Sequence, residues 1–163
     1  VVKYVPPKKG KTHVLRIVRE LLYIKSTGER TSIKKGLEFL NKVAKRKAVI
    51  FLLSDFIDDN YWDAVKIVNK KHDLIAINIF DPFEVDFPNS GMIKIEDPET
   101  KSRFWIDASS TYDLNKMNNK NIDKLEHLEK SSKKIGLDLI SISTAEDYVE
   151  PLLNLFKKRG KKY

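Results

Sequence analysis

Hydrophobic and polar positions follow two different periods along this chain. Three short segments are mostly apolar at consecutive positions and stop at a polar residue: 48–54, 74–80 and 137–142. Short apolar runs of this kind are typical of parallel strands that helices cover on both sides. Between these runs, apolar residues recur every three or four positions, which predicts amphipathic helices.

The helical period predicts five helices. They are expected after Thr12, over 33–44, over 61–72, over 112–135 and after Thr144. Thr12 and Thr144 are suitable N-cap residues, and Asp58, Asp59 and Asn60 offer caps for the third helix. A helix between two apolar strands is the unit that builds a parallel sheet, so residues 48–80 predict a βαβ unit.

Residues 91–107 break this alternation of helices and strands. Two short apolar segments are joined there through the turn sequence DPETKS, a pattern that predicts a β-hairpin. An antiparallel hairpin is an insertion in a parallel sheet and not part of its repeat. We therefore predict a single domain over residues 1–163, of the α/β class, with three layers, a mostly parallel sheet and the hairpin insertion at about 91–107.

The end of the strand 48–54 is the first place to look for chemistry. Ser54 and Asp55 stand at this end, and in open parallel sheets ligands bind beyond the carboxyl ends of the strands. The alternative is that Asp55 caps a turn before the next helix. Thr31 and Ser32, just before the second helix, also have a simple explanation, since N-capping accounts for hydroxyl groups at that position.

Composition and charge narrow the classes of function. The chain has a net charge of +8 and no cysteine, which excludes disulfides and thiolate metal sites. No apolar run approaches the roughly 20 residues of a membrane helix. Clustered Lys and Arg can bind nucleic acid, but the basic residues lie in a loop, at helix ends and in a tail. We interpret them as separate solvated ends, so we do not expect nucleic acid to be a partner.

Motifs for catalysis are missing from the sequence. There is no glycine-rich phosphate loop, and Ser54 lacks the flanking glycines of a nucleophile elbow. His13, His72 and His127 fall at predicted helix ends or on polar faces. His72 has no second His or carboxylate at metal-ligand spacing, so it is interpreted as a helix-end residue. We therefore expect no catalytic residue, no cofactor and no enzymatic activity.

Six segments, taken in order, carry a resemblance to a known family. They are YVPPKKGKTHVLRIVRELL, LEFLNKV after a loop with Thr31, VIFLLSDF, HDLIAINIFDP, IEDPETK and STAEDYVEPLLNLFKKR. This order resembles the C-terminal half of the von Willebrand factor A-like bacterial proteins of unknown function (DUF58 type), which are associated with MoxR-type AAA+ ATPases. The resemblance implies a Rossmann-like von Willebrand A fold that lacks its N-terminal strands. Since the first residue is Val1, we expect a fragment or a processed chain.

The resemblance also implies a divalent-cation site at the carboxyl ends of the strands. In the complete fold an Asp-x-Ser-x-Ser loop, a Thr and an Asp hold the ion; Thr31 and Asp55 match the last two, with Ser54 neighbouring. Hydroxyl and carboxylate oxygens suit Mg²⁺, but this ion needs near-octahedral coordination. The first motif does not occur in this sequence. We therefore expect a partial metal site without tightly bound metal, and Mg²⁺ or Mn²⁺ in the full-length protein.

The function that the resemblance implies is that of a non-enzymatic adaptor. It would recruit a client protein to a MoxR-type ATPase in protein maturation or complex assembly, in the cytoplasm, and bind a client carboxylate through the cation. One alternative is a Mg²⁺-dependent phosphotransfer enzyme that uses Asp55 with Asp58 and Asp59, and another is a basic nucleic-acid-binding domain. With its neighbouring strand absent, strand 48–54 would also present an open apolar edge, which predicts a homodimer.

Overall fold

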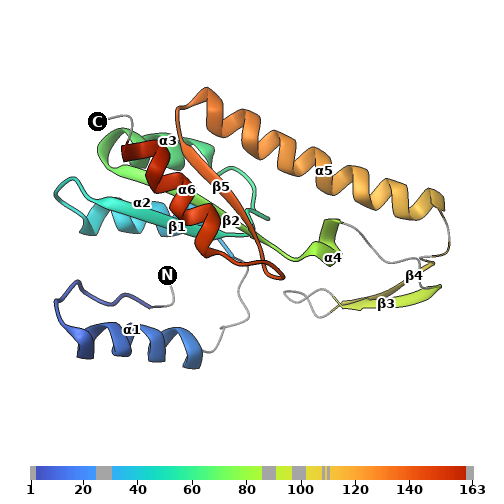
Figure 1. Cartoon of the computed structure of the whole chain (residues 1–163), viewed down its shortest axis with the longest axis horizontal. Coiled ribbons are helices and arrows are strands. Elements are labelled where there is room, and N and C mark those ends of the chain that lie inside the picture. Colours follow the sequence, from blue (N-terminus) through green and yellow to red (C-terminus); the bar gives the residue numbers. More distant parts are fainter. Residues whose placement is uncertain are drawn as a thin grey trace.

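The computed structural model describes residues 3–24, 31–85, 91–96, 102–107, 109 and 111–160, without the side chains of 84–85, 104, 106 and 111–121. Helices and strands alternate along most of the described chain (Figure 1). In order they are α1 (Lys11–Tyr23), α2 (Ile33–Val43), β1 (Val49–Ser54), α3 (Trp62–Lys71), β2 (Asp73–Phe80), α4 (Pro82–Val85), β3 (Met92–Glu96), β4 (Arg103–Asp107), α5 (Thr111–Lys134), β5 (Asp138–Ser143) and α6 (Val149–Gly160).

The three predicted apolar strands form one parallel sheet in the order β1-β2-β5. Their register pairs Val49 with Asp73 and Ile75 with Asp138. The predicted strand limits are therefore confirmed to within one residue. The class, a mixed α/β domain with a small parallel sheet, is confirmed as well. Among the described residues β1 pairs only with β2, so β1 lies at an edge of the sheet.

Helices pack on both faces of the sheet. On one face, α2 and α3 contribute Ile33, Leu37 and Val65 to a core that also holds Ile50 of β1. On the other face, Leu155 of α6 packs against the interior of β2. Every residue of β2 from Leu74 to Asn78 is buried, as expected for the central strand of such a sheet.

The predicted hairpin insertion is present as a separate two-stranded sheet. β3 and β4 pair antiparallel, with Met92 opposite Asp107 and Glu96 opposite Arg103. The hairpin follows the short helix α4 and precedes the long helix α5 along the chain. In Figure 1 it lies below both helices, away from the three-stranded sheet. The turn that joins its strands, residues 97–101, lies outside the described residues.

Helix α1 has the predicted amphipathic sequence but little packing. None of its residues is buried, and Leu21 and Leu22 are 70% and 75% exposed. The segment before it contacts α2 through the rings of Tyr4 and Phe39, whose centroids are 5.4 Å apart. α1 therefore lies apart from the sheet (Figure 1) and presents an uncovered apolar side.

Neither Thr12 nor Thr144 is the N-cap that the sequence predicts. α1 starts at Lys11 with Gly10 at its N-cap, so Thr12 lies inside the helix. The last helix does not start at Thr144; α6 starts at Val149, whose backbone N–H donates to Asp147 Oδ1 at 2.9 Å. Asp147 ends the turn that follows β5, and Pro151 then falls in the first helical turn, where its missing N–H costs no hydrogen bond. No helix in the described part of the chain is long and apolar enough to cross a membrane.

Candidate functional site

The loop after β1 holds Ser54 and Asp55 in a tight turn. Ser54 Oγ accepts the backbone N–H of Phe56 at 3.1 Å, and Asp55 Oδ1 accepts that of Ile57, also at 3.1 Å. Phe56 itself has a φ of 54°, in the left-handed region that a non-glycine residue rarely adopts. Asp55 therefore caps this turn, as the alternative interpretation of this residue predicts.

Asp58, in the same loop, caps a helix other than the predicted one. Its Oδ2 accepts the backbone N–H of Ile33, the first residue of α2, at 2.7 Å, and its Oδ1 accepts that of Asp59 at 2.8 Å. The N-cap of α3 is Tyr61, which makes no side-chain capping bond. The prediction that Asp58 caps the helix at 61–72 is thus wrong, because the loop turns its carboxylate toward the unpaired N–H groups of α2.

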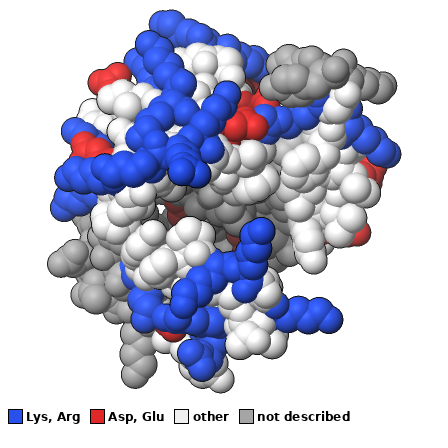
Figure 2. Space-filling view, turned by 90° about the vertical axis from the view of Figure 1, so that its left-hand side faces the viewer, with Lys and Arg blue, Asp and Glu red and all other residues white. Residues whose placement is uncertain are grey.

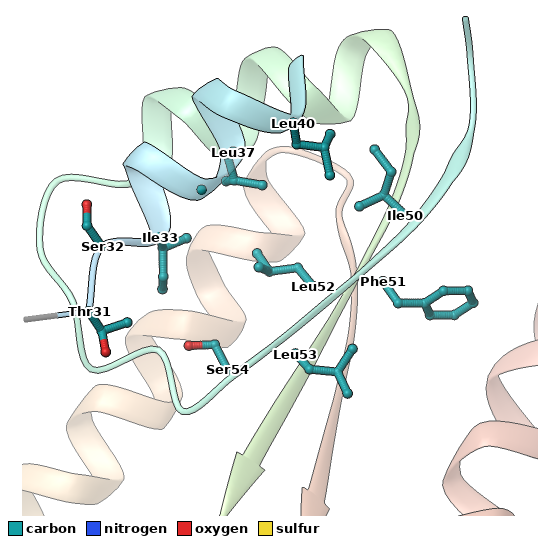
Figure 3. A pocket seen from close by; sticks show the side chains of 11 residues that line it. Thr31, Ser32, Ile33, Leu37, Leu40, Ile50, Phe51, Leu52, Leu53 and Ser54 are labelled. Atoms are coloured by element: carbon teal, nitrogen blue, oxygen red, sulfur yellow. The ribbon is translucent and has the colours of Figure 1, made fainter. Parts of the chain in front are cut away.

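A pocket of about 300 Å³ lies between α2 and β1 (Figure 3). Leu37 and Leu40 of α2 and Ile50 and Leu52 of β1 form its apolar wall. Thr31 and Ser54 line the same pocket near the carboxyl end of β1. Asp55, which the family resemblance pairs with Thr31, is not among the residues that line it. Phe51 and Leu53 point to the other side of the strand.

The carboxyl end of β1 is acidic and partly buried. Burial, reinforced by the charges of Asp58 and Asp59, raises the pKa of Tyr61 to about 12. The Tyr61 ring packs on Phe56 and Trp62, with centroid distances of 5.9 and 5.1 Å. The loop that carries Asp55 is therefore held by aromatic packing as well as by backbone hydrogen bonds.

The residues at this end form only part of a metal site. Thr31, Ser54 and Asp55 offer hard oxygen atoms, but Asp55 Oδ1 already accepts Ser54 Oγ at 3.3 Å and the Ile57 N–H. Within the described residues no three His, Cys, Asp or Glu side chains come together. Since Mg²⁺ requires near-octahedral oxygen coordination, these side chains fit a partial coordination sphere and do not complete one.

The opposite end of the sheet collects basic residues from several helix ends. The three strands are parallel, so the helix that precedes each of them ends at the same edge: α2 before β1, α3 before β2 and α5 before β5. The Lys and Arg residues brought there are Lys42, Lys45, Arg46, Lys47, Lys70, Lys71, Lys133, Lys134, Lys157, Lys158 and Arg159. Figure 2, which views this side, shows Lys and Arg side chains spread over the upper part of the molecule.

Arg159 fixes the end of α6 at this edge. Its guanidinium pairs with Asp73 and, at 3.5 Å from Nε to Oδ2, with Asp138. These carboxylates belong to the first residues of β2 and β5. His72 ends α3 beside them, as predicted, and is buried; burial first, and then the charge of Lys71, lowers its pKa.

The class of molecule defined by these observations is a mixed α/β domain in which β1 is an edge strand of the described sheet and carries a polar loop at its carboxyl end. The chain belongs to the family described as "Protein of unknown function DUF58", whose profile matches residues 1–140.

Relatives of the chain occur in mycobacteria. An uncharacterised protein of Mycobacterium avium is 22% identical over 135 residues, which cover 81% of this chain and 78% of the relative. Uncharacterised proteins of Mycobacterium bovis and Mycobacterium tuberculosis are each 23% identical over 99 residues, or 59% of this chain. The matched region spans only 31% of the length of those two relatives. No solved structure matches the chain.

Proposed function

We propose that this chain is a non-enzymatic protein-interaction domain of the von Willebrand A type that acts as an adaptor. The observation that carries the proposal is the combination of an edge strand, β1, with an apolar pocket along it and polar side chains at its carboxyl end. An edge strand offers unpaired backbone groups, and a pocket beside it accepts alternate side chains of an added strand. This combination supports binding of a segment of another protein in the pocket and at its polar end, while the family resemblance assigns the edge itself to an upstream strand of the full-length protein.

The polar end of the pocket would recognise an acidic group of the client. In the full-length protein, Thr31 and Asp55 would hold part of the coordination of Mg²⁺ or Mn²⁺, and that ion would supply an attraction for a client carboxylate. Within this chain, the hydroxyl groups of Thr31 and Ser54 set the polar limit of the pocket. The apolar wall formed by α2 would bind the client's uncharged side chains.

The partner that drives the adaptor would be a MoxR-type AAA+ ATPase in the cytoplasm. Membership of the DUF58 family supports this assignment, because the sequence resemblance to that family included the association with such ATPases. A phosphotransfer reaction has less support. Both oxygens of Asp58 already accept backbone N–H groups, so this carboxylate is committed to holding the loop.

A second copy of the chain is the other occupant that β1 could accept. Val49, Phe51 and Leu53 are 58%, 43% and 59% exposed along one side of this edge strand. Light scattering coupled to size-exclusion chromatography tests the homodimer directly. A concentration-dependent dimer that Leu53→Lys abolishes would support pairing through β1, and a monomer at all concentrations would reject it.

Mn²⁺ titration of the full-length protein by isothermal calorimetry tests the cation site. Thr31→Ala and Asp55→Ala are expected to abolish binding. Asp81→Ala is the matched control, because Asp81 follows β2 as Asp55 follows β1 and its Oδ1 likewise accepts a backbone N–H two residues on, from Phe83 at 2.9 Å. Equal loss in the control, or no binding by the unmodified protein, would overturn the cation site.

Co-elution with a MoxR-type ATPase of the same organism tests the partner separately. The full-length protein and the ATPase are expected to form a complex in size-exclusion chromatography. If the ATPase binds away from the pocket, the Asp55→Ala variant forms the same complex. Absence of a complex would overturn the ATPase assignment and would leave the outcome of the Mn²⁺ titration unaffected.

A further inference from the structure

The amino ends of the strands collect more positive charge than the fold needs for its own ion pairs and hydrogen bonds. Three of its cations have partners: Lys71 donates to Asn41, Lys133 pairs with Glu129, and Arg159 pairs with Asp73 and Asp138. Eight others are exposed and form no ion pair with the described residues: Lys42, Lys45, Arg46, Lys47, Lys70, Lys134, Lys157 and Lys158. We call these eight residues the basic end.

Interaction with the helix dipole explains the positions of some of these residues individually. It does not explain why all eight lie at one edge of the sheet. Lys70, Lys134 and Lys158 lie in the last turns of their helices, where a cation interacts favourably with the helix dipole. The run 45–47 instead stands before a strand, outside any helix. Like charges brought to one edge repel each other in the folded state. Binding of a polyanion to the basic end would relieve this repulsion.

We propose that the basic end binds the phosphate backbone of double-stranded nucleic acid, independently of base sequence. Lysine is depleted from the cores of protein interfaces, where aromatic residues and arginine are enriched. Seven of the eight cations are lysine and only one is arginine. This composition is unlike a specific protein interface, and it suits sequence-independent contacts to phosphates.

The same composition argues against two other polyanions. Single-stranded nucleic acid is bound largely by stacking of successive bases on aromatic rings. Among the residues next to the eight cations in the sequence, the exposed ring is Phe156, and it packs edge-on against Phe51. Stable attachment to a membrane surface requires an apolar anchor in addition to basic residues, and the large apolar neighbours Val43 and Phe156 are only 38% and 50% exposed. The phosphate backbone of a duplex can be bound through cations alone, so double-stranded nucleic acid is the polyanion that best matches the basic end.

The number of cations in the basic end sets the salt dependence that is expected of binding. Each phosphate neutralised in a B-form duplex contributes about −0.9 to the slope of log affinity against log salt. If half of the basic end contacts phosphates at one time, the slope is about −3.6, and the affinity falls about a hundredfold between 50 and 200 mM salt.

Fluorescence anisotropy with 20-base-pair duplexes of DNA and RNA tests the proposal. The chain is expected to bind both, regardless of sequence, with this salt dependence. Lys157→Gln/Lys158→Gln should reduce the magnitude of the slope by up to about 2. The matched control is Lys34→Gln/Lys35→Gln, which removes the same charge from exposed positions in the first turn of α2, at the other end of that helix. The control should keep the slope of the unmodified chain.

Four results would overturn the proposal. They are no binding at 25 mM salt, an equal change in slope for the control, displacement of the duplex by poly-glutamate at equal charge concentration, and preferential binding to phosphatidylglycerol vesicles. The third result would assign the surface to an acidic protein, and the fourth to an anionic membrane. If the 157/158 variant loses its far-ultraviolet circular dichroism spectrum, Lys45→Gln/Lys47→Gln replaces it, because these residues lie outside any helix or strand.

Discussion

The two ends of the three-stranded sheet use charged side chains in opposite ways. At the carboxyl ends, the carboxylates of Asp55, Asp58, Asp81 and Asp147 each accept a backbone N–H within their own loops or from a neighbouring helix. At the amino ends, eight of the eleven cations have no such partner among the described residues. The acidic end is thus occupied with holding loops in place, and the basic end is available for ligands.

The charged side chains at the two ends thus fall into two kinds: those that stabilise the fold and those that are exposed and can bind a ligand. A charge that holds the fold should affect stability when it is removed, while an exposed, unpaired charge should affect binding and leave stability nearly unchanged.

Arg159 is a structural charge at the amino ends of the strands. Its side chain is 17% exposed, and Arg159→Ala leaves the Asp73 and Asp138 carboxylates without their shared cation. We expect a loss of about 2 kcal/mol in the free energy of unfolding, less than for a fully buried pair because both carboxylates are over a third exposed. Urea denaturation measures the loss. Lys158→Gln is the control and should change stability by less than about 0.5 kcal/mol.

Asp58 is the structural charge of the acidic end. Asp58→Ala removes the acceptor for the Ile33 N–H at the start of α2, and we expect it to destabilise the fold by about 1 kcal/mol. Asp59→Ala is the matched control, since Asp59 is the neighbouring residue, carries the same charge and is exposed. Equal stability of the two variants in urea denaturation would show that Asp58 does not cap α2 in solution.

His72, at the amino end of β2, makes the stability of the fold sensitive to acid. Burial lowers its pKa in the folded protein, so the unfolded chain binds the proton first as the pH falls. Stability is therefore present above the ordinary histidine pKa of about 6.5 and is lost as the pH falls through the lowered value. Thermal unfolding between pH 7 and pH 5 should show a smaller loss for His72→Gln than for the unmodified chain. His127→Gln, at an exposed position, should follow the unmodified chain.

Tyr61 makes the acidic end sensitive to alkali. Burial and the nearby Asp58 and Asp59 raise its pKa to about 12, whereas an unfolded tyrosine ionises near 10. Its contribution to stability is thus complete below about pH 10 and is lost as the pH rises through about 12. Tyr61→Phe should lose less stability than the unmodified chain between pH 9 and pH 11. Tyr148→Phe, at a residue 62% exposed, should behave as the unmodified chain does.

The sequence predicts the strands and the hairpin well because their signals are local. The apolar runs that became β1, β2 and β5 have six to eight residues and end at turn-forming residues. The family resemblance pairs Thr31 with Asp55; Thr31 lines one pocket with Ser54, the residue before Asp55, and the pairing with Asp55 stays a prediction. Such features depend on the period of the pattern or on a known order of segments.

Contacts between distant segments were not predictable from these signals. Asp58 and Ile33 are 25 residues apart, and Arg159 and Asp73 are 86 residues apart. Their pairing depends on how α2 and α6 pack on the sheet. The gathering of cations is different, because the alternation of helices and parallel strands already implies that helix ends meet the strand starts at one edge. The pattern of each basic run by itself does not show this gathering, because only the parallel order of the strands brings the runs to one edge.

The spacing of the strands along the chain has a consequence for the order in which the domain folds. Between β1 and β2 lie 18 residues, 55–72, most of them in α3, whereas 57 residues, 81–137, separate β2 from β5. Closing the longer connection costs about 1 kcal/mol more in chain entropy. The unit β1-α3-β2 should therefore form early. β5 joins it only after the hairpin and α5 have been bridged, and α6, which packs Leu155 against Ile75 and Ile77, docks last. Until that step is complete, the apolar face of the central strand is open to solvent, so a nascent chain that stops short of α6 would be prone to aggregate.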